Sequence, residues 1–162
     1  MLAGRCWTHV LATMPGFAAI PESSIALIGA RDLDPLEERA LANSAIADVP
    51  VGSIRKLGVR AAFEPVLERL AHVVDRVYLH VDLDVLDPAG HAVNRYDVPG
   101  GLGLDEVLDA IALIGRHIPL AGGGLASYDP SVDPKGQTAE AAIAVLQAMI
   151  AARRTARVPA TR

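Results

Sequence analysis

The chain has 162 residues, of which 51% are hydrophobic and 21% are charged. This composition is typical of a globular protein and argues against disordered, collagenous and coiled-coil classes. The length predicts a single domain, 1–162, that can bury a core. With 15 Lys and Arg against 19 Asp and Glu, the net charge of −4 lacks the basic footprint of a nucleic-acid-binding protein.

The cysteine count and the hydropathy of the sequence indicate in which cellular compartment the protein belongs. Cys6 is the only cysteine, which excludes an internal disulfide and a cysteine-rich metal site and fits a reducing, cytoplasmic setting. The longest apolar stretch, 141–152, is interrupted by Gln147 and is too short and polar to cross a bilayer. We expect no membrane insertion, and we treat residues 1–20 as part of the fold rather than as a secretory signal.

The first predicted elements are short. An apolar run at 24–30 predicts a buried parallel strand. Pro35 suits the first position of a helix, and two glutamates follow it in the first turn, so residues 35–46 should be helical. Residues 51–54 predict a second short strand.

The later elements are longer and more periodic. Apolar residues recur every three or four positions over 61–74, which predicts an amphipathic helix. A strand at 76–83, a helix at 103–118, a strand at 120–128 and a closing helix at 138–153 follow. This alternation predicts the α/β class, with a three-layer α/β/α parallel sheet.

The segment 77–88 (VYLHVDLDVLDP) carries the clearest chemical signal. Alternation on a strand places His80, Asp82 and Asp84 on one face, at the carboxyl end where ligands bind in open sheets. Neighbouring carboxylates repel each other, and a hard divalent cation relieves that repulsion. Each of these residues also has a structural interpretation. Asp82 and Asp84 would then cap a turn or pair with arginine, and His80 would be a hydrogen-bonded structural histidine rather than a donor near the metal. Asp87 is interpreted as a turn residue or helix cap.

Other classes of site fit less well. Phosphotransferases with an aspartyl nucleophile follow Asp-x-Asp with Gly-Thr, where this chain has Val85 and Leu86. A nucleotide-sugar transferase would need a fold that nothing else here indicates. The glycines at 100–103 and 122–124 match neither the dinucleotide-binding nor the P-loop spacing.

Three motifs resemble one known family. HVDLDVLDP (80–88), followed by PGGLGLDE (99–106), is similar to the C-terminal half of the ureohydrolases, the family of arginase, agmatinase and formimidoylglutamase. IGARDLDP (28–35) resembles that family's Ile-Gly-x-Arg-Asp-x-Asp-Pro, and SYDP (127–130) stands where the family has Glu-x-Asn-Pro. The resemblance implies an arginase-like α/β domain that is incomplete at its N-terminal side.

The resemblance also implies a chemistry. In this family two manganese ions share a hydroxide that attacks the carbon of a guanidinium or amidine group. By motif, Asp82 would bridge both ions and Asp84 would chelate one, with His80 as a possible neighbour that supports these ligands. No other metal ligand and no catalytic residue can be assigned by motif.

Departures from the family pattern bear on function. The family's Gly-Gly-Asp-His and Asp-Ala-His-x-Asp motifs, which carry the remaining ligands, do not occur in the 162 residues. Ser127 matches the carboxylate that grips the guanidinium, and it cannot form a charged pair. Residues 94–97 replace the substrate loop, which makes Asn94 and Tyr96 substrate-loop candidates and argues against arginine or agmatine as substrate.

Two hypotheses follow. The first is a manganese-dependent hydrolase of C–N bonds that acts on a small molecule, active only if the missing N-terminal half is supplied by another chain or was lost from this sequence. The second is a non-catalytic remnant that acts as a binding or assembly module. We also expect a homo-oligomer, because half of a doubly wound sheet leaves a strand edge and apolar faces uncovered. The chain alone should be inactive and bind manganese weakly, because Asp82, Asp84 and His80 are too few to position a hydroxide and His91 and Asp97, on a flexible loop, make poor substitute ligands.

Overall fold

The computed structural model describes residues 2–155, and within them the chain is an α/β protein with parallel strands. The strands are β1 (Ala26–Ile28), β2 (Ala47–Val49), β3 (Val77–Asp82) and β4 (Leu120–Ala126). The helices are α1 (Thr8–Leu11), α2 (Pro35–Ala42), α3 (Val51–Leu57), α4 (Val59–Ala71), α5 (Leu104–His117) and α6 (Gln137–Thr155). No helix within this range is long and apolar enough to span a membrane. These elements confirm the predicted class.

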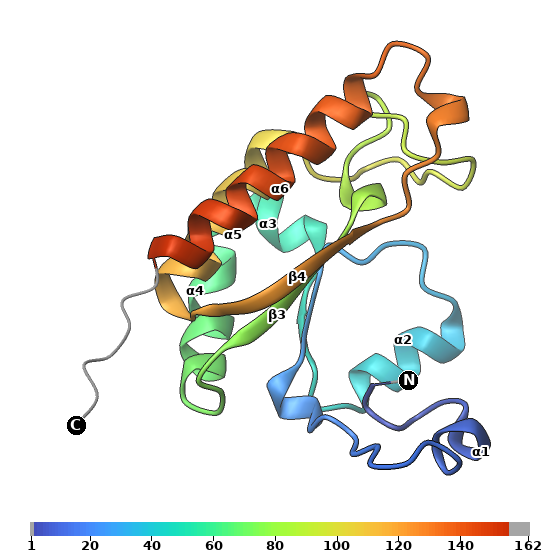
Figure 1. Cartoon of the computed structure of the whole chain (residues 1–162), viewed down its shortest axis with the longest axis vertical. Coiled ribbons are helices and arrows are strands. Elements are labelled where there is room, and N and C mark those ends of the chain that lie inside the picture. The colour runs from blue at the N-terminus through green and yellow to red at the C-terminus, as the bar shows by residue number, and fades with distance from the viewer. Residues whose placement is uncertain (1, 156–162) are drawn as a thin grey trace.

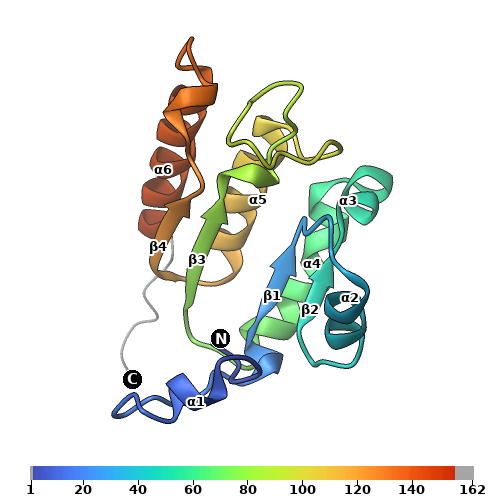
Figure 2. The same ribbon diagram turned by 90° about the vertical axis from the view of Figure 1, so that its right-hand side faces the viewer.

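The strands form two parallel pairs. β1 pairs with β2, and β3 pairs with β4, and no hydrogen-bonded ladder joins one pair to the other in the described chain. α5 and α6 pack against each other on one face of β3 and β4, and α4 lies behind β1 and β2 (Figures 1 and 2). α4 also packs against α5. The helix layer therefore continues across the interval between the two strand pairs.

One apolar core joins both pairs. Val49 of β2, Phe63 of α4 and Ile111 of α5 belong to the same cluster of buried side chains, together with Leu83 and Val145. Phe63 is 1% exposed and Leu83 is fully buried. Because burial of a large apolar side chain contributes about 1.5–3 kcal/mol, this cluster is the main source of stability.

One predicted element is wrong. Residues 51–54 form the start of helix α3, and the strand lies at 47–49 instead. Pro50 is extended and precedes the first helical turn, and Val51 and Ile54, three positions apart, are both buried. In the strand, Ala47 and Val49 are buried and Asp48 is exposed. This alternation cannot be recognised in the sequence because the strand has only three residues.

Helix α2 begins where the sequence predicts but ends earlier. α2 ends at Ala42 rather than at residue 46, because Asn43 leaves the helical conformation and its side-chain amide donates to Arg39 O at 2.8 Å. At the start of α2, the Asp34 carboxylate accepts from the N–H of Glu37 at 2.9 Å, and the Glu37 side chain accepts from Asp34 N–H. This reciprocal cap explains why the helix begins at Pro35.

After β3 the chain turns through a short 3₁₀ segment, Leu83–Val85, and then runs beside the segment that leads into α5. Leu102 N–H donates to Val85 O at 2.8 Å, and Asp87 N–H donates to Leu102 O at 2.9 Å. A Cβ at Gly101 would lie 2.5 Å from the backbone carbon and oxygen of Leu86. The close approach of these two segments therefore requires glycine.

We predict that Gly101→Ala lowers the free energy of unfolding by about 1–3 kcal/mol, because backbone atoms must shift to admit the methyl group. Urea denaturation followed by circular dichroism measures the change. Gly90→Ala is the matched control, since a Cβ there meets its nearest atom at 3.8 Å. Equal unfolding midpoints for the two variants would contradict the packing argument.

Candidate functional site

Asp82 and Asp84 lie at the carboxyl end of β3 and are half-buried. Asp82 is the last residue of the strand, and its carboxylate accepts from Asp84 N–H at 3.4 Å. Asp84 lies in the 3₁₀ turn, not on the strand, while Leu83 between them is buried in the core. The turn, rather than strand alternation alone, thus brings the two carboxylates together.

The two carboxylates interact unfavourably. Burial raises the pKa of Asp84, and the negative charge of Asp82 raises it further, while Arg31 and the Asn94 side chain oppose both effects. The dominant cause is loss of hydration on burial. A partly buried pair of this kind favours either a proton or a cation.

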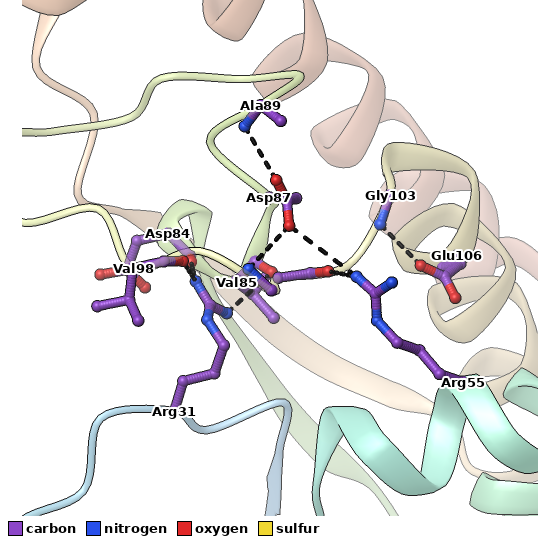
Figure 3. A network of polar contacts seen from close by, with 11 residues as sticks. Arg31, Arg55, Asp84, Val85, Asp87, Ala89, Val98, Gly103 and Glu106 are labelled. Atoms are coloured by element: carbon purple, nitrogen blue, oxygen red, sulfur yellow. Dashed lines mark hydrogen bonds and ion pairs between the residues drawn. The ribbon is translucent and has the colours of Figure 1, made fainter.

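Arg31 holds the turn that carries Asp84. Its Nη2 donates to Asp84 O at 2.5 Å and to Val98 O at 2.9 Å, and its Nη1 donates to Val85 O at 3.2 Å (Figure 3). Arg31 follows β1, so its side chain reaches from one strand pair to the end of the other. In the sequence Arg31 is visible only as part of the motif IGARDLDP (28–35), and its contacts emerge only in the folded structure.

Asp87 stabilises the residues that follow the same turn. Its carboxylate accepts from the N–H of Ala89 and of Gly100, both at 2.9 Å, and forms an ion pair of 3.9 Å with Arg55 (Figure 3). These hydrogen bonds, led by that from Ala89, lower the pKa of Asp87. Asp87 therefore serves the turn, as expected from its position before Pro88.

The substrate-loop candidates have different surroundings. Asn94 lowers the pKa of Asp84, and its side-chain oxygen accepts from Tyr96 N–H at 2.7 Å. Tyr96 is 87% exposed. Ser127 is exposed just after β4, with a left-handed φ of 72°. His80 is also exposed, on β3 beside Gly124.

Asp97 does not supply a free carboxylate. Its two oxygens accept from Val93 N–H at 2.9 Å and from Asn94 N–H at 3.2 Å, and so they shape the loop. Within residues 2–155, no group of three or more His, Cys, Asp or Glu side chains is arranged to hold a metal ion. Asp82 and Asp84 fit part of a hard-cation site by their chemistry, but they do not complete one.

Comparison with known proteins identifies the family. The model of the arginase family matches residues 7–151, so the chain belongs to this family. An arginase from Staphylococcus aureus (strain COL) is 32% identical over 128 residues, which cover 78% of this chain and 42% of that protein. A formimidoylglutamase from Bacillus subtilis (strain 168) is 34% identical over 94 residues, 57% of this chain and 29% of that protein.

The solved structures agree with the sequence relatives. An arginase from Bacillus subtilis superposes with a TM-score of 0.80 and 26% identity, covering 88% of this chain and 49% of that chain. The chain thus spans less than half the length of these relatives. The arginase-like α/β fold is confirmed.

The raised pKa of Asp84 predicts a pH-dependent instability in metal-free buffer. The native state holds the proton more tightly than the unfolded state, so stability is lost as pH rises from the unfolded pKa through the folded pKa. Asp84→Asn should therefore melt at a higher temperature than the parent at pH 7. The difference should shrink below about pH 4, near the ordinary pKa of aspartate.

Thermal unfolding from pH 3 to pH 8 in the presence of EDTA tests this expectation. Asp75→Asn removes one exposed negative charge outside the site and serves as the control. Destabilisation of Asp84→Asn at pH 7 would mean that the carboxylate stabilises the turn more than its repulsion weakens it.

Proposed function

We propose that this chain is part of a manganese-dependent, cytoplasmic ureohydrolase that cleaves a C–N bond in a guanidinium or amidine compound. Residues 1–162 would form one partial arginase-like domain, and the remaining metal ligands would come from family sequence outside these residues, on the same polypeptide or on another. The observation that carries the proposal is the Asp82 and Asp84 pair, held on a braced turn in a chain of the arginase family.

The unfavourable electrostatics support a cation at this position. Two half-buried carboxylates in contact cost free energy unless a positive charge compensates them. Arg31 donates to the backbone carbonyl of Asp84 and not to its carboxylate, so its hydrogen bonds do not satisfy the acid. Asp82 and Asp84 would hold the cation, which when bound supplies Lewis acidity and lowers the pKa of coordinated water.

The surrounding residues would position these ligands. Arg31 and Asp87 fix the backbone of the turn, and Asn94 favours the charged form of the Asp84 carboxylate by lowering its pKa. None of these residues is assigned a catalytic role. Their contribution is to limit the movement of a carboxylate that must stay in place when a substrate binds.

The three residues that the motifs would place toward a substrate are uncharged. Ser127 offers a hydroxyl, Asn94 an amide and Tyr96 a phenol, none of which forms a charged pair with a guanidinium. These groups favour recognition by neutral hydrogen bonds. The named relatives include both arginases and a formimidoylglutamase, so both substrate types belong in the test.

A second candidate function is a non-catalytic binding or assembly module. It is favoured by the lack, within residues 2–155, of a third acidic or histidine side chain beside the carboxylate pair. Metal affinity separates the candidates, because an assembly module has no need for the cation.

We predict that the chain binds Mn²⁺ weakly and reversibly, with a Kd on the order of 0.1–1 mM, the range of oxygen sites with few charged ligands. Isothermal titration calorimetry measures the affinity. Asp82→Asn/Asp84→Asn should abolish binding, and Asp75→Asn/Asp109→Asn, with the same charge change on exposed residues, should retain it. Equal affinity in both double variants would assign the metal to another place.

We also predict no turnover by the chain alone, because two carboxylates are too few to position a reactive hydroxide. Urea and ammonia release is assayed with added Mn²⁺ against arginine, agmatine, guanidinobutyrate and formimidoylglutamate. Turnover that is lost in Asp82→Asn/Asp84→Asn would show that the chain, as a monomer or homo-oligomer, builds a complete site by itself.

A further inference from the structure

Helix α6 is apolar on two opposite faces. Its inner face packs against β4 and α5, and it buries Val145 and Met149. Its outer face carries Ile143, Leu146 and Ile150, which are 55%, 42% and 56% exposed. We refer to these three side chains as the outer stripe. A helix at the surface normally presents polar side chains to water, so a second apolar face indicates a second packing partner.

The outer stripe has the spacing of a helix that packs against another helix. Its members are three and four positions apart, so they lie on one side of α6 within about two turns. Ala139, one turn before Ile143, continues the same line and is half-buried. Its small side chain allows a second helix to approach closely. α6 lies at the outside of the molecule, where such a helix can reach it (Figure 2).

The outer stripe is centred on the helix. α6 extends over Gln137–Thr155, and Leu146 is its middle residue, with Ile143 and Ile150 three and four positions to either side. A two-fold axis at Leu146 would lay α6 antiparallel along a second α6 over the full length of both helices. Leu146 would then contact the other copy's Leu146, and Ile143 would contact the other copy's Ile150. One patch would serve both copies, as a two-fold interface requires.

The charges of α6 fit the same arrangement. Glu140 lies in the first turn, Arg153 lies two residues before the end, and both side chains are exposed. They stand six and seven positions from Leu146, on opposite sides of it. An antiparallel copy therefore brings the acidic end of one helix beside the basic end of the other, and it opposes the two helix dipoles. A parallel copy would bring like charges together instead.

We propose that the outer stripe is the contact between two copies of this chain, which associate through α6 as an antiparallel, two-fold dimer. The contact is on the side of α6 that faces away from β4, and it requires neither a metal nor catalysis. It therefore goes beyond the proposed function. Because each copy contributes only three large apolar side chains, we expect a weak dimer with a Kd on the order of 10–100 µM.

The symmetry of α6 favours a second copy over a membrane surface. Helices that lie on membranes carry several Lys or Arg side chains beside their apolar face. Within residues 137–153, the charged side chains of α6 are Glu140 and Arg153 alone, and the whole chain has a net charge of −4. One acid and one base, placed almost equally far from the centre, match a copy of the same helix better than an anionic surface.

Sedimentation of the full chain in EDTA, from well below to well above the expected Kd, measures the association. We expect a reversible equilibrium between monomer and dimer. Leu146→Glu places two like charges at the two-fold axis and should raise the Kd at least about tenfold. Leu36→Glu adds the same charge at an exposed leucine of α2 and should leave the Kd unchanged. Circular dichroism verifies that both variants fold.

Cross-linking tests the antiparallel orientation independently of Leu146. Cys6 is the only cysteine, so Cys6→Ser gives a background without thiols. In that background a short bismaleimide should join Ile143→Cys protein to Ile150→Cys protein in a mixture. Each protein alone should give at least about fivefold less product, because its two thiols would lie about 10 Å apart along the helices.

Three results would overturn the inference. The first is a chain that stays monomeric at every concentration, and binding of that monomer to anionic phospholipid vesicles would assign the outer stripe to a membrane. The second is a dimer that Leu146→Glu and Leu36→Glu affect equally, which would place the interface elsewhere. The third is cross-linking of Ile143→Cys protein to itself as efficiently as to Ile150→Cys protein, which would exclude the antiparallel arrangement. None of these measurements involves manganese or turnover, so their failure is distinct from failure of the proposed function.

Discussion

Apolar contact between α4 and α5 holds the two strand pairs of this chain in one structure. No hydrogen-bonded ladder joins β2–β1 to β3–β4 among the described residues, so the helix layer and its shared core set their spacing. Parallel strands are normally covered on both faces, and here the helix layer is continuous while the strand layer is interrupted. The interruption leaves the facing edges of β1 and β3 without a partner strand among the described residues.

Arg31 makes a second connection between the pairs, at the end where the carboxylates lie. Its guanidinium reaches from the end of β1 to carbonyls on the turn after β3. The position of Asp84 thus depends on both strand pairs. The placement of the pairs and the geometry of the carboxylates are therefore physically coupled at this residue.

Sequence alone predicted the elements that are long and periodic. β3 and α5 follow from alternation and from spacing of three and four, because each extends over enough residues to show its period. The strand predicted at 51–54 was wrong because β2 has only three residues and α3 follows it after a single proline. Their apolar residues therefore follow one another in the sequence without a visible period. The acidic pair was found from its spacing, although the turn that brings the carboxylates together was not.

Long-range contacts account for what sequence could not predict. The bonds from Arg31 to residues 84, 85 and 98 span more than fifty positions, and no local pattern encodes them. Asp97 was considered as a substitute ligand, yet its carboxylate is used by neighbouring backbone N–H groups. The cavity between β1 and β3 likewise arises from how the pairs are placed, and local periodicity carries no information about that placement.

Reconstitution tests the central claim that this chain contributes part of a metal-dependent site. This chain is co-expressed with the N-terminal half of the Staphylococcus aureus arginase, the purified complex is loaded with Mn²⁺, and turnover of the four amidine and guanidinium substrates is measured together with the amount of bound manganese. We predict turnover in the complex, none in either half alone, and loss of turnover in a complex that contains Asp82→Asn/Asp84→Asn. Turnover that persists in that double variant, or a manganese-loaded complex that acts on none of the substrates, would contradict the account.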